Sequence, residues 1–353
     1  MEASADPIAP PEHPHGGGVG VAGAVPVNTN PWVSGRRGVL LRPELGLPLI
    51  IVCLGAFLSF KSQYFLDWQN LMNITDAVAY LGVAASFATI VAIAGGIDLT
   101  PVVVMVMVGI VSNALLGAGV PIVAVIAIAL VAACAIGLLN GLLISVIGLN
   151  SFIVTLGTNF LFTGVAFVVT NGQSKLIENE RFTSLFQSTI FFNIPTDTVA
   201  MLVAVGFVFF LLRYTKFGTY VFAVGGNESA ARLSGVAVRK VKIQFYVLGS
   251  LGAGLAGIIL ASNSGAVAAY AASGANADLL TILAAVIIGG TALTGGRGSV
   301  IGTACGILLL GMITNGLVLL NISSFWQPVV TGLILLLALI LDEFRRRVTL
   351  AAG

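Results

Sequence analysis

Carboxylates within apolar stretches are the first residues in this sequence whose chemistry stands out. Asp76, Asp98 and Asp278 each lie in or beside a long apolar run. An ionisable group inside a helical bundle usually marks an ion or substrate pathway. Thr100 and Pro101 are typical of an N-cap and the first helical residue, and a carboxylate just before a helix is stabilised by the helix dipole. We therefore interpret Asp98 as structural, and we keep Asp76 and Asp278, near the outer ends of their helices, as candidates for a substrate or ion role.

The residue types that other chemistry needs are missing from the apolar segments. The only two histidines lie in the N-terminal tail, and Cys53, Cys134 and Cys305 are far apart, unlike a disulfide framework or a metal site. The stretch GAFLSFKS, residues 55–62, comes nearest to a phosphate-binding loop, but Phe60 stands where the second glycine is required. We expect no metal and no cofactor on this chain, and the sequence does not favour an intramembrane enzyme.

A polar segment, FAVGGNESAARLSGVAVRKVK at residues 222–242, interrupts the apolar sequence. Asn227 is a good N-cap, Glu228 suits the first helical turn, and Gly235 suits the left-handed position after a helix end. The pattern predicts a two-turn helix, which is too short to be stable alone because isolated helices below about 12–15 residues are marginal in water. It either packs on its own bundle or docks into the groove of a partner protein.

The composition places most of the chain in a membrane. Hydrophobic residues make up 58% and charged residues 8% of the sequence, and residues 99–174 and 243–277 contain no Asp, Glu, Lys or Arg. A membrane-spanning helix needs about 20 apolar residues. We therefore predict an all-α polytopic protein of about ten transmembrane helices. The apolar segments lie at about 44–60, 72–94, 100–118, 121–147, 151–170, 197–213, 242–262, 277–293, 299–320 and 325–341.

The basic residues predict the orientation of these helices. With both termini on the cytoplasmic side, thirteen of the sixteen Lys and Arg residues are cytoplasmic, and Lys61, Lys175 and Arg181 remain outside. This asymmetry satisfies the positive-inside rule. We therefore predict three parts of the chain. Residues 1–34 form a disordered cytoplasmic tail, residues 35–345 form a transmembrane domain with a cytoplasmic loop at 214–241, and residues 346–353 form a second cytoplasmic tail.

Four stretches resemble ribose-type ABC sugar importer permeases, the inner-membrane components of bacterial binding-protein-dependent systems. They are AGGIDLT, SFIVTLGTNFLFTGVAFVVTNGQ, GGNESAARLSGV and IIGGTALTGGRGSVIGTACGILLLGMITNGL, and the similarity runs in order from about 44 to 345. One departure is the sequence Thr100-Pro101-Val102, where the family usually has a Ser followed by a Val-Gly pair. The segments AGGIDLTP (94–101) and IGGTALTG (288–295) also resemble each other, either as half-repeats or by chance.

The resemblance implies a fold and an assembly. The fold would be that of a type II ABC importer permease in the bacterial inner membrane. Two copies would form a homodimer, two cytoplasmic ATPase subunits would carry ATP and Mg, and a periplasmic sugar-binding protein would deliver the solute. We also expect the chain to contact the lipid bilayer, and we expect no nucleic acid among its partners. The implied function is ATP-driven import of a monosaccharide or related polyol, and the alternative is an ion-coupled secondary transporter of a small neutral solute.

The resemblance also implies roles for residues. The segment 222–242 would carry the coupling helix, in which Leu233 fills an apolar groove of the ATPase and Glu228 and Arg232 make polar contacts at its rim. The implied coupling residues are Gly225, Gly226, Asn227, Glu228, Ala231, Arg232, Leu233 and Gly235. Sugars are recognised by amides, hydroxyls and aromatic faces, although in bundles such groups also form hydrogen bonds between helices. Together with the two acids, the candidate pathway residues are Asn73, Asp76, Phe152, Thr155, Asn159, Asn263, Ser264, Asn276 and Asp278.

Overall fold

The computed structural model describes residues 43–267, 275–323 and part of 325–340. Within these ranges, the side chains at 43–46, 191 and 275–276 are not described. The two predicted tails, 1–34 and 346–353, lie outside the described residues. The predicted last helix, 325–341, falls on residues that are described only in part.

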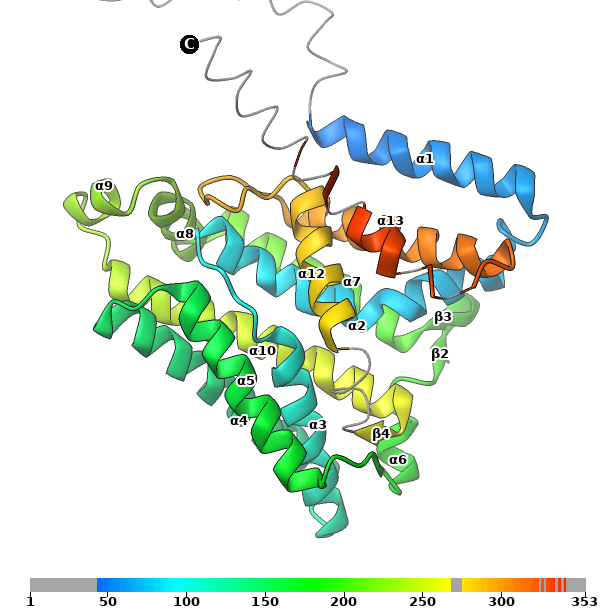
Figure 1. Cartoon of the computed structure of the whole chain (residues 1–353), viewed down its shortest axis with the longest axis horizontal. Coiled ribbons are helices and arrows are strands. Elements are labelled where there is room, and N and C mark those ends of the chain that lie inside the picture. Colours follow the sequence, from blue (N-terminus) through cyan, green and yellow to red (C-terminus); the bar gives the residue numbers. More distant parts are fainter. Residues whose placement is uncertain are drawn as a thin grey trace, which may run out of the picture. The chain divides into compact units, whose positions relative to one another are not determined.

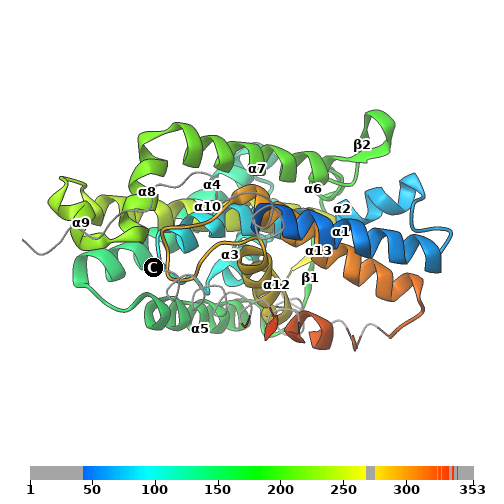
Figure 2. The ribbon, with the colours of Figure 1, turned by 90° about the horizontal axis from the view of Figure 1, so that it is seen from above.

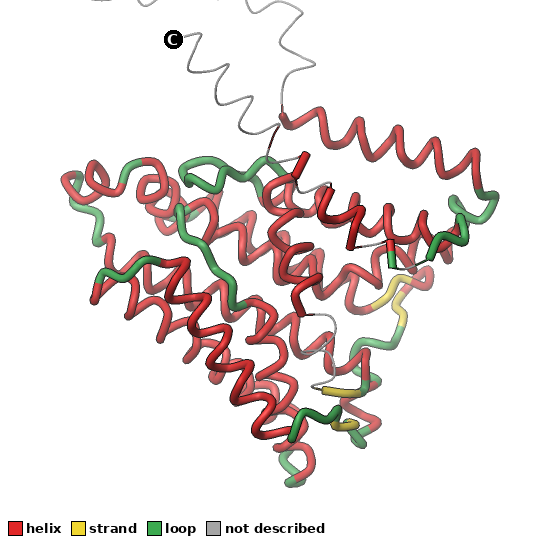
Figure 3. The backbone as a smooth tube through the Cα atoms, in the orientation of Figure 1, coloured by secondary structure: helices red, strands yellow, loops and turns green. Residues whose placement is uncertain are grey.

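Long apolar helices make up most of the described chain (Figures 1 and 3). A helix lies on each of the first nine predicted segments, and their bounds are α1 Pro43–Lys61, α2 Trp68–Ile93, α3 Pro101–Gly117, α4 Ile122–Leu142, α5 Ser151–Thr170, α7 Thr196–Tyr214, α10 Val238–Ser264, α12 Ala275–Ile288 and α13 Val300–Leu319. The π-helical turn η1, Leu143–Ile147, extends α4. Among the described residues, six helices (α2, α4 with η1, α5, α7, α10 and α13) are long and apolar enough to cross a membrane. The polytopic prediction is confirmed, while the count of ten crossings stays a prediction.

Short elements join these helices. The helix α6, Glu180–Thr183, and the 3-10 turn η2, Phe191–Asn193, lie between α5 and α7. Two antiparallel ladders pair β1 (Lys175–Leu176) with β4 (Ala266–Val267), and β2 (Thr189–Ile190) with β3 (Ile194–Pro195). The predicted loop 214–241 contains two helices, α8 (Lys216–Gly226) and α9 (Glu228–Leu233). Both views place α9 and β2 at opposite ends of the helices (Figures 1 and 2).

Helix α10 forms the centre of the core and packs against α2, α3 and α4. Small residues allow this close packing. A Cβ atom added at Gly257 would lie 2.7 Å from the Cα atom of Met105 in α3, and one added at Gly252 would overlap the Phe87 ring in α2. Gly306 approaches the backbone of α12 at Ala285 in the same way. Glycines therefore replace side chains where three of the helix pairs meet.

The start of α3 corrects one detail of the sequence interpretation. Thr100 is at the N-cap position before Pro101, but its side chain makes no capping hydrogen bond. Instead, the Thr100 hydroxyl and backbone N–H both donate to Asp98 Oδ1, at 2.6 and 2.8 Å. The carboxylate of Asp98 is buried and needs hydrogen-bond donors, and the Thr100 hydroxyl supplies one of them.

Candidate functional site

The predicted two-turn helix is present as α9, with the predicted ends. The Asn227 side chain accepts a hydrogen bond of 2.9 Å from the backbone N–H of Ala230. Gly235 follows the helix at φ +85, and the N–H of Val236 donates to the Ala231 carbonyl at 3.0 Å. Together with the Gly235 N–H bond to Arg232, this forms a Schellman motif. Local capping therefore defines both ends of α9.

The two faces of α9 have different surroundings. Ala231 is 5% exposed and belongs to the same buried apolar cluster as Val224 and Val238. Leu233, two residues further on, is 91% exposed. Ala231 therefore holds α9 on its own bundle, while Leu233 stands free for another surface. The structure therefore shows the packing of α9 on its own bundle, while docking of the exposed face into a partner stays a prediction.

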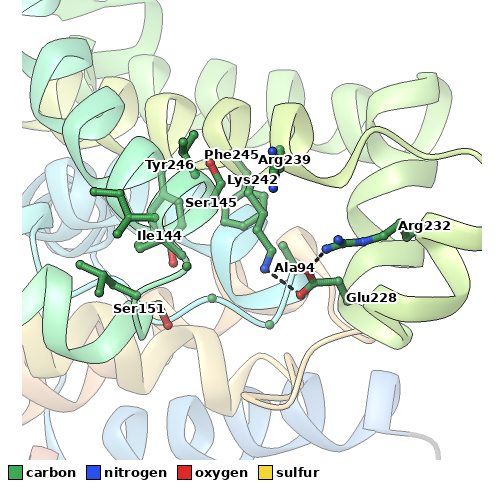
Figure 4. A pocket seen from close by; sticks show the side chains of 16 residues that line it. Ala94, Ile144, Ser145, Ser151, Glu228, Arg232, Arg239, Lys242, Phe245 and Tyr246 are labelled. Atoms are coloured by element: carbon green, nitrogen blue, oxygen red, sulfur yellow. Dashed lines mark hydrogen bonds and ion pairs between the residues drawn. The ribbon is translucent and has the colours of Figure 1, made fainter.

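Glu228 links α9 to the first turns of α10 (Figure 4). Its carboxylate accepts from Lys242 Nζ at 2.7 Å and from Arg232 Nη2 at 3.1 Å. The hydrogen bond from Lys242, with a further contribution from Arg232, lowers the pKa of the Glu228 carboxyl group, against the opposing effect of partial burial. Glu228 was expected at the rim of a partner's groove, but here both of its oxygens have partners within this chain.

A glycine junction, defined as Gly95, Gly225, Gly295 and Gly296, joins the approach to α9 to two other segments. A Cβ atom added at Gly225 would collide with the Ile93 carbonyl oxygen at the end of α2 and lie 2.6 Å from the Gly296 nitrogen. One added at Gly295 would lie 2.8 Å from both the Gly225 oxygen and the Gly95 Cα atom. The Gly296 N–H also donates to the Ile93 carbonyl at 2.8 Å. Backbone therefore touches backbone where α8, the end of α2 and the α12–α13 loop meet.

Several candidate pathway residues gather at the other end of the helices. Asp197 in α7 is fully buried, and its Oδ2 accepts a 3.0 Å hydrogen bond from Asn263 Nδ2 in α10. Its Oδ1 accepts from the Thr198 N–H at 2.6 Å, and the carboxyl group also contacts that of Asp76 in α2. We call Asp76, Asp197 and Asn263 the polar cluster. Asp197 was not among the sequence candidates, although the sequence does show an acid at the start of this apolar helix.

Asp278 lies against the same helix, α2. Its Oδ2 accepts a 2.9 Å hydrogen bond from the Tyr80 hydroxyl. Tyr80 and Asp76 are four residues apart and therefore share one face of α2. Tyr80, which the sequence interpretation did not single out, thus connects α2 to α12 one turn from the polar cluster.

The α5 candidates lie far from the polar cluster, beside the connection between α2 and α3. The Thr155 hydroxyl is 3.3 Å from the Ile97 carbonyl, and Asn159 Nδ2 donates to the Leu99 carbonyl at 2.5 Å. These bonds hold the connection in place. Phe152, about one helical turn before Thr155 and two turns before Asn159, is exposed.

The remaining candidates have local contacts. Asn73 is exposed and accepts a 3.2 Å hydrogen bond from Gln69 in the same helix. The Ser264 hydroxyl donates to the backbone carbonyls of Leu260 and Ala266. The backbone of Asn276 lies in α12, but its side chain is outside the described residues.

Asp98 belongs to a buried network between α3, α4 and α5. Asp98 accepts the two bonds from Thr100 that are described above. Asn140 extends the network, because it donates a hydrogen bond to the Thr100 hydroxyl at 3.4 Å and accepts one from the Thr158 hydroxyl at 2.7 Å. Burial raises the pKa of the Asp98 carboxyl group, opposed by the hydrogen bonds from Thr100. The network supports a structural role for Asp98. Asn140, a lone amide in the apolar run of α4, was not singled out from the sequence.

The described residues offer no ready metal centre, since no group of three or more His, Cys, Asp or Glu side chains gathers among them. What the arrangement provides is a short, half-exposed helix at one end, fixed by backbone contacts, and hydrogen-bonding groups from several helices at the other end.

Known proteins resemble the chain over most of its length. The family described as branched-chain amino acid transport system / permease component matches residues 70–339. The ribose import permease protein RbsC of Bacillus subtilis is 36% identical over 305 residues, which are 86% of this chain and 92% of RbsC. RbsC of Escherichia coli K12 is 35% identical over 89% of this chain and 99% of its own length. The L-arabinose ABC transporter permease protein AraH of Azospirillum brasilense is 35% identical over 85% of this chain and 88% of its own length.

No solved structure matches the chain. The relatives confirm the resemblance to ribose-type permeases that four stretches of sequence carried, and the six long apolar helices agree with a protein embedded in the membrane. The chain is thus a multi-pass membrane protein, and it belongs to the branched-chain amino acid transport system / permease component family.

Proposed function

We propose that this chain is the membrane-translocating subunit of an ATP-driven importer of a monosaccharide or related polyol in the bacterial inner membrane. The observation that carries the proposal is α9, a capped helix that is packed on its own bundle through Ala231 and presents Leu233 to the outside. The relatives named above import ribose or L-arabinose by their printed names. The chain hydrolyses nothing itself, and a separate ATPase supplies the energy.

Helix α9 is the element on which that ATPase docks. An exposed leucine on a short helix suits the helix-in-groove mode of recognition. The Glu228–Lys242 pair ties α9 to α10, and the glycine junction ties its approach to α2 and to the α12–α13 loop. A displacement of α9 therefore reaches α10 through the side chains of Glu228 and Lys242, and it reaches α2 and the α12–α13 loop through direct backbone contacts. Gly225 acts at this junction, while Gly235 ends the helix.

The proposed assembly is the one that the resemblance to ribose-type permeases implies. Two copies of the chain form the pore, and α9 and both termini face the cytoplasm, as the distribution of Lys and Arg favours across ten crossings. Two ATPase subunits bind ATP and Mg on that side, and a binding protein delivers the solute from the periplasm.

The polar cluster and the Tyr80–Asp278 pair are the candidate solute contacts. Carboxylates accept hydrogen bonds from hydroxyls, and amides both donate and accept them. Asn263 Oδ1 is buried and has no hydrogen-bond partner among the described residues, so the cluster retains an unused acceptor. A neutral polyhydroxylated solute fits such groups better than an amino acid does, because the carboxylate of an amino acid would lie beside those of Asp76 and Asp197.

The same cluster favours one rival function. Acids within a bundle are the groups that ion-coupled secondary transporters use. Such a transporter would work without an ATPase and would be driven by an ion gradient. The requirement for ATP therefore separates the two functions.

The docking role of α9 is tested by replacing Leu233. Leu233→Asp places a charge in an apolar groove, and we expect the affinity for the ATPase to fall by about a hundredfold or more. Leu233→Met keeps an apolar side chain of similar size and serves as the matched control. The measurement is co-purification of the tagged chain with the ATPase. Equal recovery of the ATPase with both variants would refute the docking role of Leu233.

A further inference from the structure

A cavity of about 490 Å³ lies beside α9 (Figure 4). Its wall is built from the α2–α3 connection, the η1 turn with the residues after it, α9, and the first turns of α10. The cavity is separate from the polar cluster, none of whose members lines it. Nothing in the proposed transport mechanism uses this space.

Positive charge dominates the cavity. Arg232, Arg239 and Lys242 line it, and Glu228 is the only acid in its wall. Glu228 is already bonded to Arg232 and Lys242. Arg239 has no ion pair with any residue that the structure describes. The wall therefore holds three cations against one carboxylate, and this excess suits an anionic group.

One side of the cavity is apolar and exposed. Val146, Ile147 and Leu149 belong to the cavity wall, and their exposed fractions are 54%, 65% and 47%. They lie at the end of η1 and in the connection to α5, at the end of two membrane-crossing candidates. An occupant with a phosphate and a hydrocarbon chain would meet cations on one side and these side chains on the other.

We propose that this cavity binds the headgroup of an anionic phospholipid, whose phosphate lies near Arg239 and whose acyl chains pass over Val146, Ile147 and Leu149. Basic pockets at the end of membrane helices suit phosphate-bearing headgroups, and basic residues near the membrane surface attract anionic lipids. A free phosphate or a phosphorylated metabolite would use the cations alone and leave the apolar rim unused. The lipid uses both parts of the wall, so we assign the site to the lipid.

The bound headgroup would touch α9 and α10 together. Arg232 belongs to α9, and Arg239 and Lys242 belong to α10. An anion among them adds a second bridge beside the Glu228–Lys242 pair. The lipid therefore stiffens the base of α9. This inference rests on the membrane location of the chain, and its cytoplasmic placement rests on the proposed function.

Native mass spectrometry of the purified full chain tests the site without an ATPase. Phosphatidylglycerol and phosphatidylcholine with the same acyl chains are added in separate titrations. The variant is Arg239→Gln, and the matched control is Lys240→Gln, which removes the same charge one residue away from an exposed position outside the cavity wall. Arg239→Lys keeps the charge. Melting temperatures of all variants establish that they are folded.

We expect wild type to retain phosphatidylglycerol in preference to phosphatidylcholine. Arg239→Gln should weaken phosphatidylglycerol binding about fivefold, the loss typical of one basic residue near an anionic membrane surface. Lys240→Gln and Arg239→Lys should bind as wild type does. Equal losses in Arg239→Gln and Lys240→Gln, or equal binding of the two lipids, would overturn the assignment.

Two further arms distinguish other occupants. Inorganic phosphate should not displace the lipid at millimolar concentration, and displacement would identify free phosphate as the ligand and overturn the lipid assignment. An acidic surface of the ATPase is the other candidate. If Arg239→Gln lost the ATPase in co-purification while lipid binding stayed unchanged, the cavity would belong to the protein interface and the lipid proposal would fail. Loss of lipid binding with normal co-purification supports the proposal and leaves the function of α9 intact.

Discussion

The two ends of the helical bundle are held together in different ways. At the α9 end, the glycine junction brings three stretches of backbone into contact with no side chain between them. At the other end, the polar cluster joins α2, α7 and α10 through side-chain contacts, and Tyr80 joins α2 to α12. Asp76 and Ile93 mark these ends on α2 and are about 25 Å apart along the helix.

This difference matches what each end would do in the proposed importer. Backbone contacts are close and stiff, because no rotamer change can relieve a collision with a main-chain atom. Side-chain hydrogen bonds can exchange one partner for another, and a solute hydroxyl can take the place of an amide. The α9 end therefore suits the transmission of displacement, and the polar end suits the recognition of a solute.

The largest effect is expected at the glycine junction. Gly225→Ala puts a Cβ atom against the Ile93 carbonyl and the Gly296 nitrogen, and we expect it to lower the free energy of unfolding by about 3 kcal/mol. Gly226→Ala is the matched control, since a Cβ atom there meets nothing within 4 Å. Thermal unfolding in detergent measures both variants. If the two variants had the same melting temperature, the contact at Gly225 would not be tight.

A smaller effect is expected in the polar cluster. Asp197→Ala leaves the Asn263 amide and the Thr198 N–H without their acceptor, at a cost of about 1–3 kcal/mol for a buried group left unpaired. Solute uptake should also fall. Asp67→Ala is the control, because Asp67 is an exposed acid at a helix start whose side chain makes no capping bond. An Asp197→Ala protein with normal stability and uptake would remove Asp197 from the site.

The smallest effect is expected at Glu228, whose side chain is 41% exposed and therefore screened by solvent and salt. Glu228→Gln should speed amide hydrogen exchange in α9 modestly at neutral pH, and high salt should shrink the difference. Because the Glu228 pKa is lowered in the folded chain, its stabilising pairs persist above the ordinary value of 4.5 and are lost as the pH falls below it. Wild type and variant should then converge in acid.

Glu180→Gln is the control for Glu228. Glu180 is also an acid in the first turn of a short helix, α6, and it forms no ion pair within the described part of the chain. Faster exchange in α9 for both variants, or a Glu228 effect that is insensitive to salt, would argue against an electrostatic link between α9 and α10.

Local features were predictable from the sequence, and contacts between distant segments were not. Asn227 and Gly235 define α9 through bonds within a few residues, so its existence and bounds followed from the pattern. The glycine junction joins positions 95, 225 and 295, and no local rule connects them. Gly225 was implied as a coupling residue, but its contact with Ile93 and Gly296 depends on how the helices pack.

The polar residues show the same limit. Asp76 and Asp278 were selected because acids are rare in apolar runs, and both are near other polar groups in the structure. Asp197 stands in the first turn of α7, where the helix dipole alone can account for an acid, so its position in the sequence does not reveal its contacts with Asp76 and Asn263. The α5 residues Thr155 and Asn159 have the right chemistry for a sugar, but they bond to the backbone of the α2–α3 connection.

The central claim is that a separate ATPase drives transport through this chain, and the requirement for that ATPase tests it most directly. Proteoliposomes are prepared with this chain alone, or with its ATPase and binding protein, and uptake of labelled ribose and arabinose is followed with and without ATP. The account predicts accumulation only when the ATPase, the binding protein and ATP are all present, and no accumulation by the chain alone under an ion gradient. Gradient-driven accumulation by the chain alone would contradict it.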